Sequence, residues 1–314
     1  MIYISEEQSA ALASHELAYA AAKKALMAAM EPGATIFPVL KAHGSDPQNI
    51  FGVKSSSDKN LAGLKVGSYF PTNDAAGLAR HGSIILLYDQ SRGRISYIVE
   101  AGLLNAYRTA ASDAVATDTL ARKDASVMAL FGTGHQAEYE AAAIAGIRNL
   151  SKILVVGRTP EKTEAFVNHL REQGLPAERM DAESACRAAD IIVTATTATE
   201  PLFDAEWVQP GTHVSSMGSD APGKQELPPE LFQKAKLFCD LASQSRVAGD
   251  FQHAEQDAIL TPIGRVLMGE TNGQTADDQI TVFDSSGISL QDLYMAEAII
   301  GLHQPHVDLK GLKT

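Results

Sequence analysis

Hydrophobic and polar positions follow two different patterns along this chain, and the change falls near residue 125. The first pattern begins with a helical stretch over about 6–30, which Pro32 and Gly33 end. Short apolar runs bounded by turn residues come next, at 35–42, 49–56, 63–70, 83–89 and 94–100. Because no long helix separates these runs, they predict a mostly antiparallel sheet or barrel, which a long helix over 103–122 follows.

From about residue 125 onwards, strands alternate with helices. Apolar runs lie at 127–131, 152–156, 190–196, 212–218, 236–240 and 280–287, with helical segments at 135–148, 160–173 and 228–235 and a last helix over 290–304. This spacing is typical of parallel βαβ units. The sequence therefore predicts an α/β protein. A Rossmann-type doubly wound parallel sheet is expected in residues 113–288, and a second α+β domain with a mostly antiparallel sheet in residues 1–112 plus 289–314.

Composition narrows the class of protein. The chain has 314 residues, of which 45% are hydrophobic and 20% charged, so it has enough apolar side chains for a sizeable core. Its formal net charge of -12 argues against a general nucleic-acid binder, because phosphate binding needs a basic face. Cys186 and Cys239 form no disulfide framework and are expected to be buried thiols. The N-terminus carries acids where a signal peptide needs a basic end, and no apolar run approaches the roughly 18 residues of a membrane span. A soluble cytoplasmic protein, without a membrane partner, is expected.

One strand-to-helix turn has the spacing of a dinucleotide-binding site. In 127-VMALFGTGHQAEYEAAAIAG-146, Gly132 permits a tight turn, Gly134 lets backbone amides approach a pyrophosphate, and Ala137 keeps the helix close to the strand. The helix N-terminus would then face the anion. The alternative is a glycine-rich turn without a ligand.

The end of the next strand favours one form of the cofactor. A site for NAD(H) usually places an acid there to accept the ribose 2'-hydroxyl, but this chain has Gly157, Arg158 and Thr159 and no acid before Glu161. Arg158 is suited to pair with a 2'-phosphate and Thr159 to donate to it. NADP(H) is therefore expected in preference to NAD(H), which stays the second choice. Alternatively, Arg158 is a solvated side chain at a helix start.

Five separated blocks resemble the ornithine cyclodeaminase/mu-crystallin family from end to end. They are 63-GLKVGSYFPTN-73, 107-YRTAAS-112, 131-FGTGHQA-137, 218-GSDAPGKQEL-227 and 283-FDSSGISLQD-292. The resemblance implies a homodimer in which the first half and the last helix form the substrate-binding and dimerisation domain. It also implies hydride transfer between a nicotinamide and the α-carbon of an amino or imino acid. Family activities include ornithine and lysine cyclodeaminases, alanine dehydrogenase and ketimine reductases.

An α-imino acid needs a cationic group for its carboxylate, an acid near its nitrogen and a hydride donor. By resemblance, Lys65 and Arg108 hold the carboxylate and Asp220 moves the proton, which makes Lys65 and Asp220 the expected catalytic residues. The alternative for Lys65 is an edge residue whose charged end reaches water. The alternative for Asp220 is a turn cap within 219-SDAPG-223.

The resemblance also indicates which residues line the cofactor. Thr109 would touch its phosphates or its nicotinamide end. The other expected cofactor residues follow predicted strands and are Gly132, Thr133, Gly134, His135, Gln136, Arg158, Thr159, Ala195, Thr196, Thr197, Met217, Gly218 and Ser286. The histidines show no HxxxH or other ligand cluster, so no metal is expected.

The chain departs from the family pattern at its first strands. Lys41 stands where many members carry a substrate arginine, and Lys54 where cyclodeaminases usually have Met-Pro. The cyclodeaminase acid expected just before Lys54 is missing from residues 51–53. Two gained lysines and a lost acid suit a more anionic substrate than ornithine, although both lysines could instead sit at exposed strand ends. His81 is a possible second donor to the substrate.

These observations lead to a main hypothesis and two alternatives. The main one is NAD(P)H-dependent reduction of a small α-imino acid to an amino acid, or the reverse oxidation, with a dicarboxylic imine such as iminosuccinate as a plausible substrate. The first alternative is an ornithine cyclodeaminase that converts ornithine to proline and ammonia with bound NAD. The second is a non-catalytic, crystallin-like NADPH-binding protein.

Overall fold

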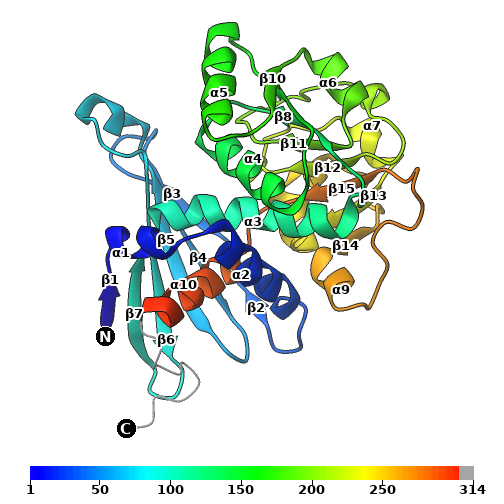
Figure 1. Cartoon of the computed structure of the whole chain (residues 1–314). Coiled ribbons are helices and arrows are strands. Elements are labelled where there is room, and N and C mark those ends of the chain that lie inside the picture. Colours follow the sequence, from blue (N-terminus) through cyan, green and yellow to red (C-terminus); the bar gives the residue numbers. More distant parts are fainter. Residues whose placement is uncertain (304–314) are drawn as a thin grey trace. The chain divides into compact units, whose positions relative to one another are not determined.

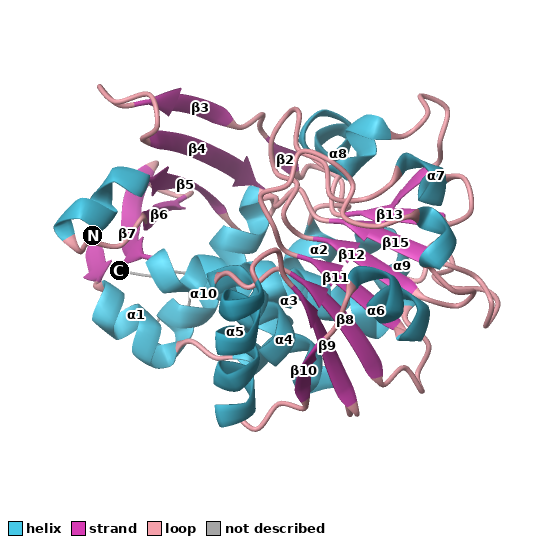
Figure 2. Ribbon diagram, turned by 90° about the horizontal axis from the view of Figure 1, so that it is seen from above, coloured by secondary structure: helices cyan, strands magenta, loops and turns pink. Residues whose placement is uncertain are grey.

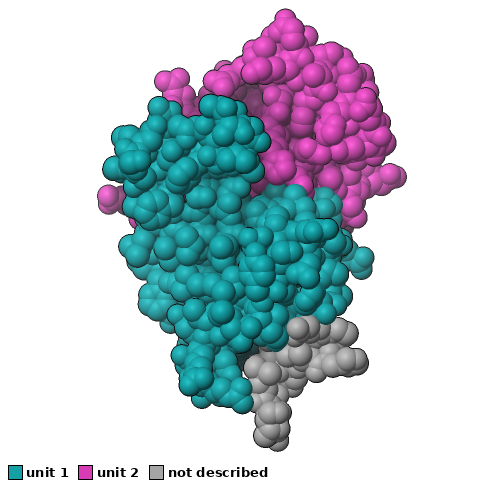
Figure 3. Space-filling view, turned by 90° about the vertical axis from the view of Figure 1, so that its left-hand side faces the viewer, with its two compact units in different colours: residues 1–108, 288–314 teal, residues 109–287 magenta. Residues whose placement is uncertain are grey.

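The computed structural model describes residues 1–303, and its elements are labelled in Figure 1. The chain divides into two compact units, which Figure 3 distinguishes by colour. Unit 1 contains residues 1–108 and the chain from residue 288, and unit 2 contains residues 109–287. The boundaries expected from the sequence fell after residues 112 and 288. Residues 304–314, which the sequence pattern assigned to the first domain, lie outside the described residues.

Unit 1 contains a mostly antiparallel sheet. Its order is β1-β7-β6-β5-β4-β2, with β3 also paired to β4, and β1–β7 is the one parallel pair among the described strands of this sheet. The strands are β1 (Ile2–Ile4), β2 (Thr35–Ile36), β3 (Leu40–His43), β4 (Ile50–Ser57), β5 (Ala62–Tyr69), β6 (His81–Asp89) and β7 (Arg94–Glu100). The antiparallel sheet expected from the short apolar runs is confirmed.

The N-terminal helical stretch is two helices rather than the single one expected. Ala13 is extended, and the Ser14 hydroxyl accepts a hydrogen bond from the Leu17 amide to start a second helix. The helices of this part of the chain are α1 (Glu6–Leu12), α2 (His15–Ala28), the 3-10 helix η1 (Pro71–Ala76), α3 (Gly102–Leu120) and α10 (Ser289–His303). α3 runs from unit 1 into unit 2.

One face of the unit 1 sheet is covered by helices. α10 packs beside α2 and against β4, β5 and β6 (Figure 1). Side chains on a strand alternate between faces, and accordingly Ile85 and Leu87 are buried whereas Ile84 and Tyr88 are exposed. The exposed face also carries apolar side chains, among them Leu40, Phe51 and Val66.

Unit 2 contains a fully parallel sheet of order β10-β9-β8-β11-β12-β15-β13-β14. α4 and α5 lie on one side of β8, β9 and β10, and α6 lies on the other (Figure 2), which is the doubly wound arrangement expected. The strands are β8 (Val127–Phe131), β9 (Lys152–Val156), β10 (Ala177–Arg179), β11 (Ile191–Thr194), β12 (His213–Ser216), β13 (Lys236–Cys239), β14 (Leu260–Pro262) and β15 (Thr281–Asp284).

The helices of unit 2 are α4 (His135–Ile147), α5 (Pro160–Glu172), α6 (Ala182–Ala188), η2 (Ala205–Trp207), α7 (Pro229–Phe232), α8 (Ala242–Ala248), η3 (Asp250–His253) and α9 (Ile263–Leu267). Strands β10 and β14 and helices α6, α8 and α9 were not expected from the sequence. Each of these five elements is seven residues or shorter, and β10 reads Ala-Glu-Arg, so none carries a recognisable apolar period.

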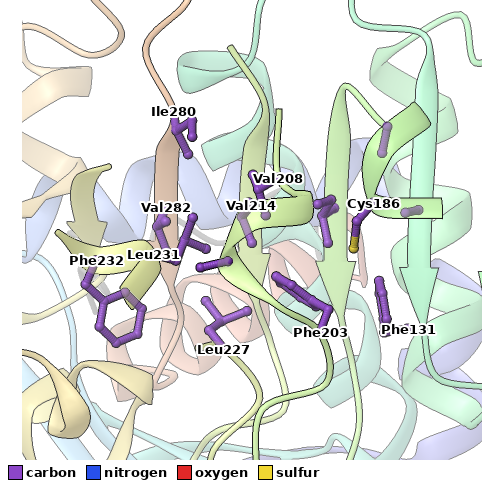
Figure 4. Close-up of a cluster of buried hydrophobic side chains, with 14 of the residues drawn as sticks. Phe131, Cys186, Phe203, Val208, Val214, Leu227, Leu231, Phe232, Ile280 and Val282 are labelled. Atoms are coloured by element: carbon purple, nitrogen blue, oxygen red, sulfur yellow. The ribbon is translucent and has the colours of Figure 1, made fainter. Parts of the chain in front are cut away.

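The core of unit 2 is an apolar cluster against its sheet (Figure 4). Phe131 and Phe203 pack with ring centroids 5.2 Å apart, and Phe232 and Phe251 meet edge to face. Cys186 and Cys239 belong to the same cluster and are both free thiols. This packing fixes the strands of the sheet and therefore the loops at their ends.

A search of residues 1–303 for a transmembrane helix finds none that is both long and apolar enough.

Candidate active site

Two buried cations from different elements meet in unit 1. Lys65 projects from the middle of β5 and Arg108 from α3, and their exposed fractions are 7% and 8%. The Lys65 ammonium donates to Asp292 Oδ1 at 2.9 Å and to Asn105 Oδ1 at 2.7 Å. These bonds use two of its three donors, so the ammonium keeps capacity for a ligand. The alternative for Lys65, an edge residue whose charged end reaches water, does not fit its burial on an inner strand of the sheet.

Arg108 shares the same acceptors. Its Nη2 donates to Asn105 Oδ1 at 2.7 Å, its Nη1 to Gln291 Oε1 at 3.4 Å, and its Nε lies 3.3 Å from Asp292 Oδ1. Asn105 lies one helical turn before Arg108 on α3, and Asp292 and Gln291 lie on α10. Strand and helices therefore hold both cations in fixed positions before any substrate binds.

The electrostatics of this group centre on Lys65. Burial lowers the pKa of Lys65 to about 7, Asp292 acts in the opposite direction, and Arg108 and Lys54 lower it further. Burial by itself would raise the pKa of Asp292, but the charges of Lys65, Arg108 and Lys54 bring it below its usual value. Asp292 therefore stays a carboxylate. Lys54, Lys65 and Arg108 are called the cationic cluster below.

Strand register places the other expected substrate residues on the face that carries Lys65. Lys54 is directly opposite Lys65, and Lys41 is opposite Gly52, two residues from Lys54. A Cβ added at Gly52 would lie 3.6 Å from Lys41 Cγ, so the Lys41 side chain extends over that glycine. Lys54 is half-buried and Lys41 is exposed.

His81 lies on the same face at the start of β6. It is opposite Tyr69, and the two ring centroids are 4.8 Å apart. Tyr69 and Lys65 are four residues apart on β5 and therefore point to the same side. All the substrate-binding residues expected from the strands of unit 1 thus share one face of its sheet. Their roles toward a substrate stay predictions.

The residues expected to bind the cofactor gather at one edge of the unit 2 sheet. Because its strands are parallel, their carboxyl ends share that edge, which is where ligands bind in such sheets. Gly132, Thr133, Gly134, His135 and Gln136 follow β8, Arg158 and Thr159 follow β9, Ala195, Thr196 and Thr197 follow β11, Met217 and Gly218 follow β12, and Ser286 follows β15. Thr109 differs, because it lies within α3.

The turn after β8 has the geometry that a dinucleotide requires. Gly132 has φ +125°, and a Cβ there would come within 2.6 Å of the Ala195 carbonyl oxygen. Gly134 precedes α4 with an extended backbone, and a Cβ added to it would meet no atom within 4 Å. Open space in front of the first amides of a helix of 13 residues fits a pyrophosphate.

The turn after β9 keeps Arg158 available. Arg158 and Thr159 are exposed, and α5 begins at Pro160 directly behind them. Gly157 is required for packing, because a Cβ there would lie 2.3 Å from Thr163 Oγ1. An exposed guanidinium at this strand end suits a 2'-phosphate, and it equally suits a solvated side chain.

Asp220 lies beyond β12, close in sequence to the cofactor edge. Its side chain is exposed, and Lys224 Nζ donates to its Oδ1 at 2.6 Å and to the Gly218 carbonyl at 3.0 Å. Lys224 therefore stabilises both the carboxylate and the loop that carries it. Its role as proton carrier stays a prediction.

The sequence reasoning missed Glu226, which is fully buried behind the cofactor edge. It accepts hydrogen bonds from the amides of Thr196 and Gly218 at 2.6 and 2.8 Å and from the hydroxyl of Thr194 at 2.8 Å. Burial, reinforced by Asp250, raises its pKa. One carboxyl group thus accepts hydrogen bonds from both the segment after β11 and the segment after β12. The sequence signal that could have pointed to Glu226 is its position within the block 218–227.

Asn105, Gln291 and Asp292 were also missed as parts of the site. Asn105 precedes Arg108 by three residues on a helix, a spacing that brings side chains together. Gln291 and Asp292 end the block 283–292. A similar acid in unit 2, Asp240, accepts from the Ser286 hydroxyl at 2.7 Å and the Gly287 amide at 2.6 Å, which fixes the loop after β15.

Over residues 1–303, no group of three or more His, Cys, Asp or Glu side chains has the arrangement of a metal site.

Comparison with known proteins places this geometry in a family. Residues 9–302 match the model of the ornithine cyclodeaminase/mu-crystallin family. Iminosuccinate reductase of Paracoccus denitrificans is 34% identical over 309 residues, which are 96% of each chain. Its crystal structure in complex with NAD+ superposes with a TM-score of 0.91 at 33% identity over 97% of each chain. An archaeal alanine dehydrogenase dimer with bound NAD gives a TM-score of 0.89 at 27% identity over 98% of each chain.

The family model covers nearly the whole chain, and these relatives match both units from end to end. The buried cations of unit 1 and the glycine turn of unit 2 lie within the matched residues. The protein belongs to the ornithine cyclodeaminase/mu-crystallin family.

Proposed function

We propose that this protein is an NAD(P)H-dependent oxidoreductase that reduces a small α-imino acid to an amino acid and catalyses the reverse oxidation. The observation that carries the proposal is the buried pair of Lys65 and Arg108, which are held on shared acceptors with donors to spare. A pre-positioned cationic pair of this kind suits a carboxylate. The relatives named above are a reductase and a dehydrogenase that act on imine or amino groups.

Each residue has a defined part in this reaction. Arg108 and Lys65 bind the α-carboxylate and orient the carbon–nitrogen double bond. A nicotinamide cofactor held at the turn after β8 would supply the hydride for the α-carbon. Asp220 passes a proton to the nitrogen, so that one hydride and one proton convert the imine to the amine.

A dicarboxylic imine such as iminosuccinate is the substrate that the charges favour. Lys54 adds a third cation beside Lys65, Lys41 lies on the same face, and Asp292 is the acid that interacts with the cluster. An additional carboxylate on the substrate would be attracted by these positive side chains. An ornithine cyclodeaminase fits less well, since the acid that would hold the distal amine is absent from residues 51–53.

For the cofactor, we propose NADPH in preference to NADH. Arg158 and Thr159 support this preference, because they follow β9 where an acid would otherwise contact the 2'-hydroxyl. The test is Arg158→Ser, with Arg187→Ser on α6 as the control. The first change should raise KM for NADPH about tenfold and leave KM for NADH unchanged, as loss of one charged hydrogen bond implies. Equal KM values for both cofactors in the unaltered enzyme would contradict the preference.

We further propose a homodimer formed through the exposed face of the unit 1 sheet. Leu40, Phe51, Val66 and Ile84 lie on that face, opposite to Lys65, and their exposed fractions are 70, 40, 38 and 40%. A contiguous apolar face of this kind is typical of an interface. Sedimentation velocity of the intact protein and of Val66→Lys tests it, since the variant should shift the dimer toward monomer.

The two free buried thiols, Cys186 and Cys239, support a reducing compartment, and we propose the cytoplasm.

Turnover measurements separate the candidate activities. NADPH consumption should be measured with oxaloacetate plus ammonium, pyruvate plus ammonium, and pyrroline-2-carboxylate, with the product identified by mass spectrometry. We expect aspartate to form fastest. Faster reduction of pyrroline-2-carboxylate than formation of aspartate would contradict the proposal of a dicarboxylic substrate. Release of ammonia from ornithine without net change in nicotinamide absorbance would indicate a cyclodeaminase, and NADPH binding without any turnover a non-catalytic protein.

A further inference from the structure

The carboxylate of Asp292 interacts with the whole cationic cluster. Its Oδ1 accepts from Lys65 Nζ at 2.9 Å and lies 3.3 Å from Arg108 Nε, and its charge also acts on Lys54. Asp292 is 1% exposed, so no substrate needs to touch it for it to exert these effects. It lies in the first turn of α10, far along the chain from β5 and α3.

We propose that Asp292 is a positioning residue of the site, which holds the side chains of Lys65 and Arg108 in place and favours the charged form of the buried Lys65. This inference rests on the proposed function for its catalytic consequence but not for its structural one. Nothing in the sequence reasoning assigned a role to Asp292.

The burial of the group explains why an acid is needed. An ammonium taken out of water loses hydration that must be replaced by hydrogen bonds and opposite charge. Around Lys65 the charged neighbours are Lys54 on β4, Arg108 on α3 and Asp292 on α10, while Asn105 supplies a neutral acceptor. Two of the three charged neighbours repel the ammonium. The Asp292 carboxylate is the one that stabilises it.

Loss of this carboxylate would change both the protonation state of Lys65 and the orientation of its side chain. With burial and two like charges unopposed, the ammonium would release its proton at a lower pH. An uncharged amine no longer binds a carboxylate strongly. The effect should therefore depend on pH, which distinguishes it from a general loss of packing.

The direct test is competitive acetylation of the intact protein with acetic anhydride between pH 4 and 10, with the Lys65 peptide quantified by mass spectrometry. The titration midpoint of Lys65 should fall by about one to three pH units in Asp292→Asn, the range produced by a close opposite charge. Asp292→Glu keeps the charge and should stay close to the unaltered protein. Lys54→Met removes a repelling charge and should raise the midpoint.

Asp58→Asn is the matched control. Asp58 is also a buried carboxylate that contacts α10, through the Tyr294 hydroxyl, but it is not among the groups that act on Lys65. An unchanged Lys65 midpoint in Asp292→Asn, or an equal shift in Asp58→Asn, would overturn the proposal. If Asp292→Asn fails to fold, an unchanged midpoint in Lys54→Met would do the same, because it would show that neighbouring charges do not set the state of Lys65.

Activity gives the second readout. In Asp292→Asn the basic limb of the profile of kcat/KM for imine reduction should move to lower pH, with activity partly recovered in acid, and Asp292→Glu should restore it. Acetylation requires no substrate, so a shifted Lys65 midpoint without any imine turnover would refute the proposed function and leave the role of Asp292 standing. Imine turnover with an unshifted Lys65 midpoint would refute the role of Asp292 and leave the proposed function standing.

Discussion

Lys54 and Lys65 lie directly opposite each other on β4 and β5, so two ammonium side chains share one face of an antiparallel pair. Like charges in this position destabilise a sheet unless an anion lies between or beside them. Asp292 accepts a hydrogen bond from Lys65, and the charge of Lys54 also acts on the same carboxylate. We expect this concentration of positive side chains on one face to favour an anionic substrate.

Replacement of Lys54 by Met should separate substrates by charge. We expect KM for the dicarboxylic imine to rise about 10- to 100-fold, since a charged hydrogen bond contributes about 1.5 to 3 kcal/mol. KM for a monocarboxylic imine should change little, because Lys65 and Arg108 still bind the α-carboxylate. Initial rates over a range of substrate concentrations measure both values.

Lys59→Met is the control for Lys54. Lys59 lies between β4 and β5, is exposed and forms an ion pair with Glu31. Its removal lowers the charge of unit 1 by the same amount without touching the cationic cluster, so both KM values should be unaffected. A rise in KM for both imines in Lys54→Met would mean that Lys54 binds the shared α-carboxylate instead.

Arg108→Lys tests whether the guanidinium is needed for its shape. The planar group contacts Asn105 and Gln291 through separate nitrogens, and a single ammonium cannot reproduce this orientation. We expect kcat/KM to fall about 10- to 150-fold, equivalent to about 1.5 to 3 kcal/mol, with little change in melting temperature. Steady-state kinetics and a thermal melt check both parts. Unchanged kinetics would remove Arg108 from the site.

The two glycines of the turn after β8 should behave differently. Gly134→Val fills space that is open, so we expect a fold of normal stability that no longer gains melting temperature from NADPH. Gly132→Val should lower the melting temperature itself, because φ is +125° and a side chain would strike the Ala195 carbonyl. A Gly134→Val protein that still binds NADPH tightly would refute the assignment of this turn.

Asp113 predicts a pH dependence of stability within unit 2. Burial raises its pKa from 3.8 to about 6, although hydrogen bonds from Ser215 and Thr117 oppose the shift. The folded chain thus binds more protons than the unfolded chain between these values. Its contribution to stability is complete below about pH 4 and is lost as the pH rises through 6. The melting temperature of the unaltered protein relative to Asp113→Asn should therefore decrease from pH 4.5 to 8.

Asp181→Asn is a control of opposite sign. Asp181 caps α6, and a hydrogen bond from the Ser184 amide lowers its pKa, so its contribution is lost only as the pH falls below about 4. Between pH 4.5 and 8 the difference between the unaltered protein and this variant should stay constant. A constant difference for Asp113→Asn as well would contradict the raised pKa of Asp113.

Long, strongly periodic segments were predicted well. The runs at 127–131 and 152–156 became β8 and β9 with the expected bounds, and the helix expected over 103–122 became α3. The two strands are nearly continuous apolar runs because they are buried in a parallel sheet, and such runs are readable without coordinates. The break at Ala13 and the short helices α6, α8 and α9 were not readable, because one or two turns carry too few positions for a period.

The sequence pointed to the cations of the candidate site more readily than to its acids, and the roles of both stay predictions. The family-like blocks contain Lys65 and Arg108, and a departure from the family pattern in residues 51–56 pointed to Lys54. Glu226 and Asp292 were not, because a buried acid far along the chain has no local signature of the groups it will contact. Their partners come from other elements: Thr196 and Gly218 for Glu226, and β5 and α3 for Asp292.

The sequence alone determined the two kinds of sheet, the glycine turn after β8 and the identities of the cations, since each depends on local period or on residue type. Only the tertiary structure decided that Lys41, Lys54, Lys65 and His81 share one face, because strand register is fixed by pairing between distant segments. It alone also placed Asp292 against Lys65, across 227 residues of chain. Burial of both groups in one place changes their charge energetics, and no local pattern of residues encodes that burial.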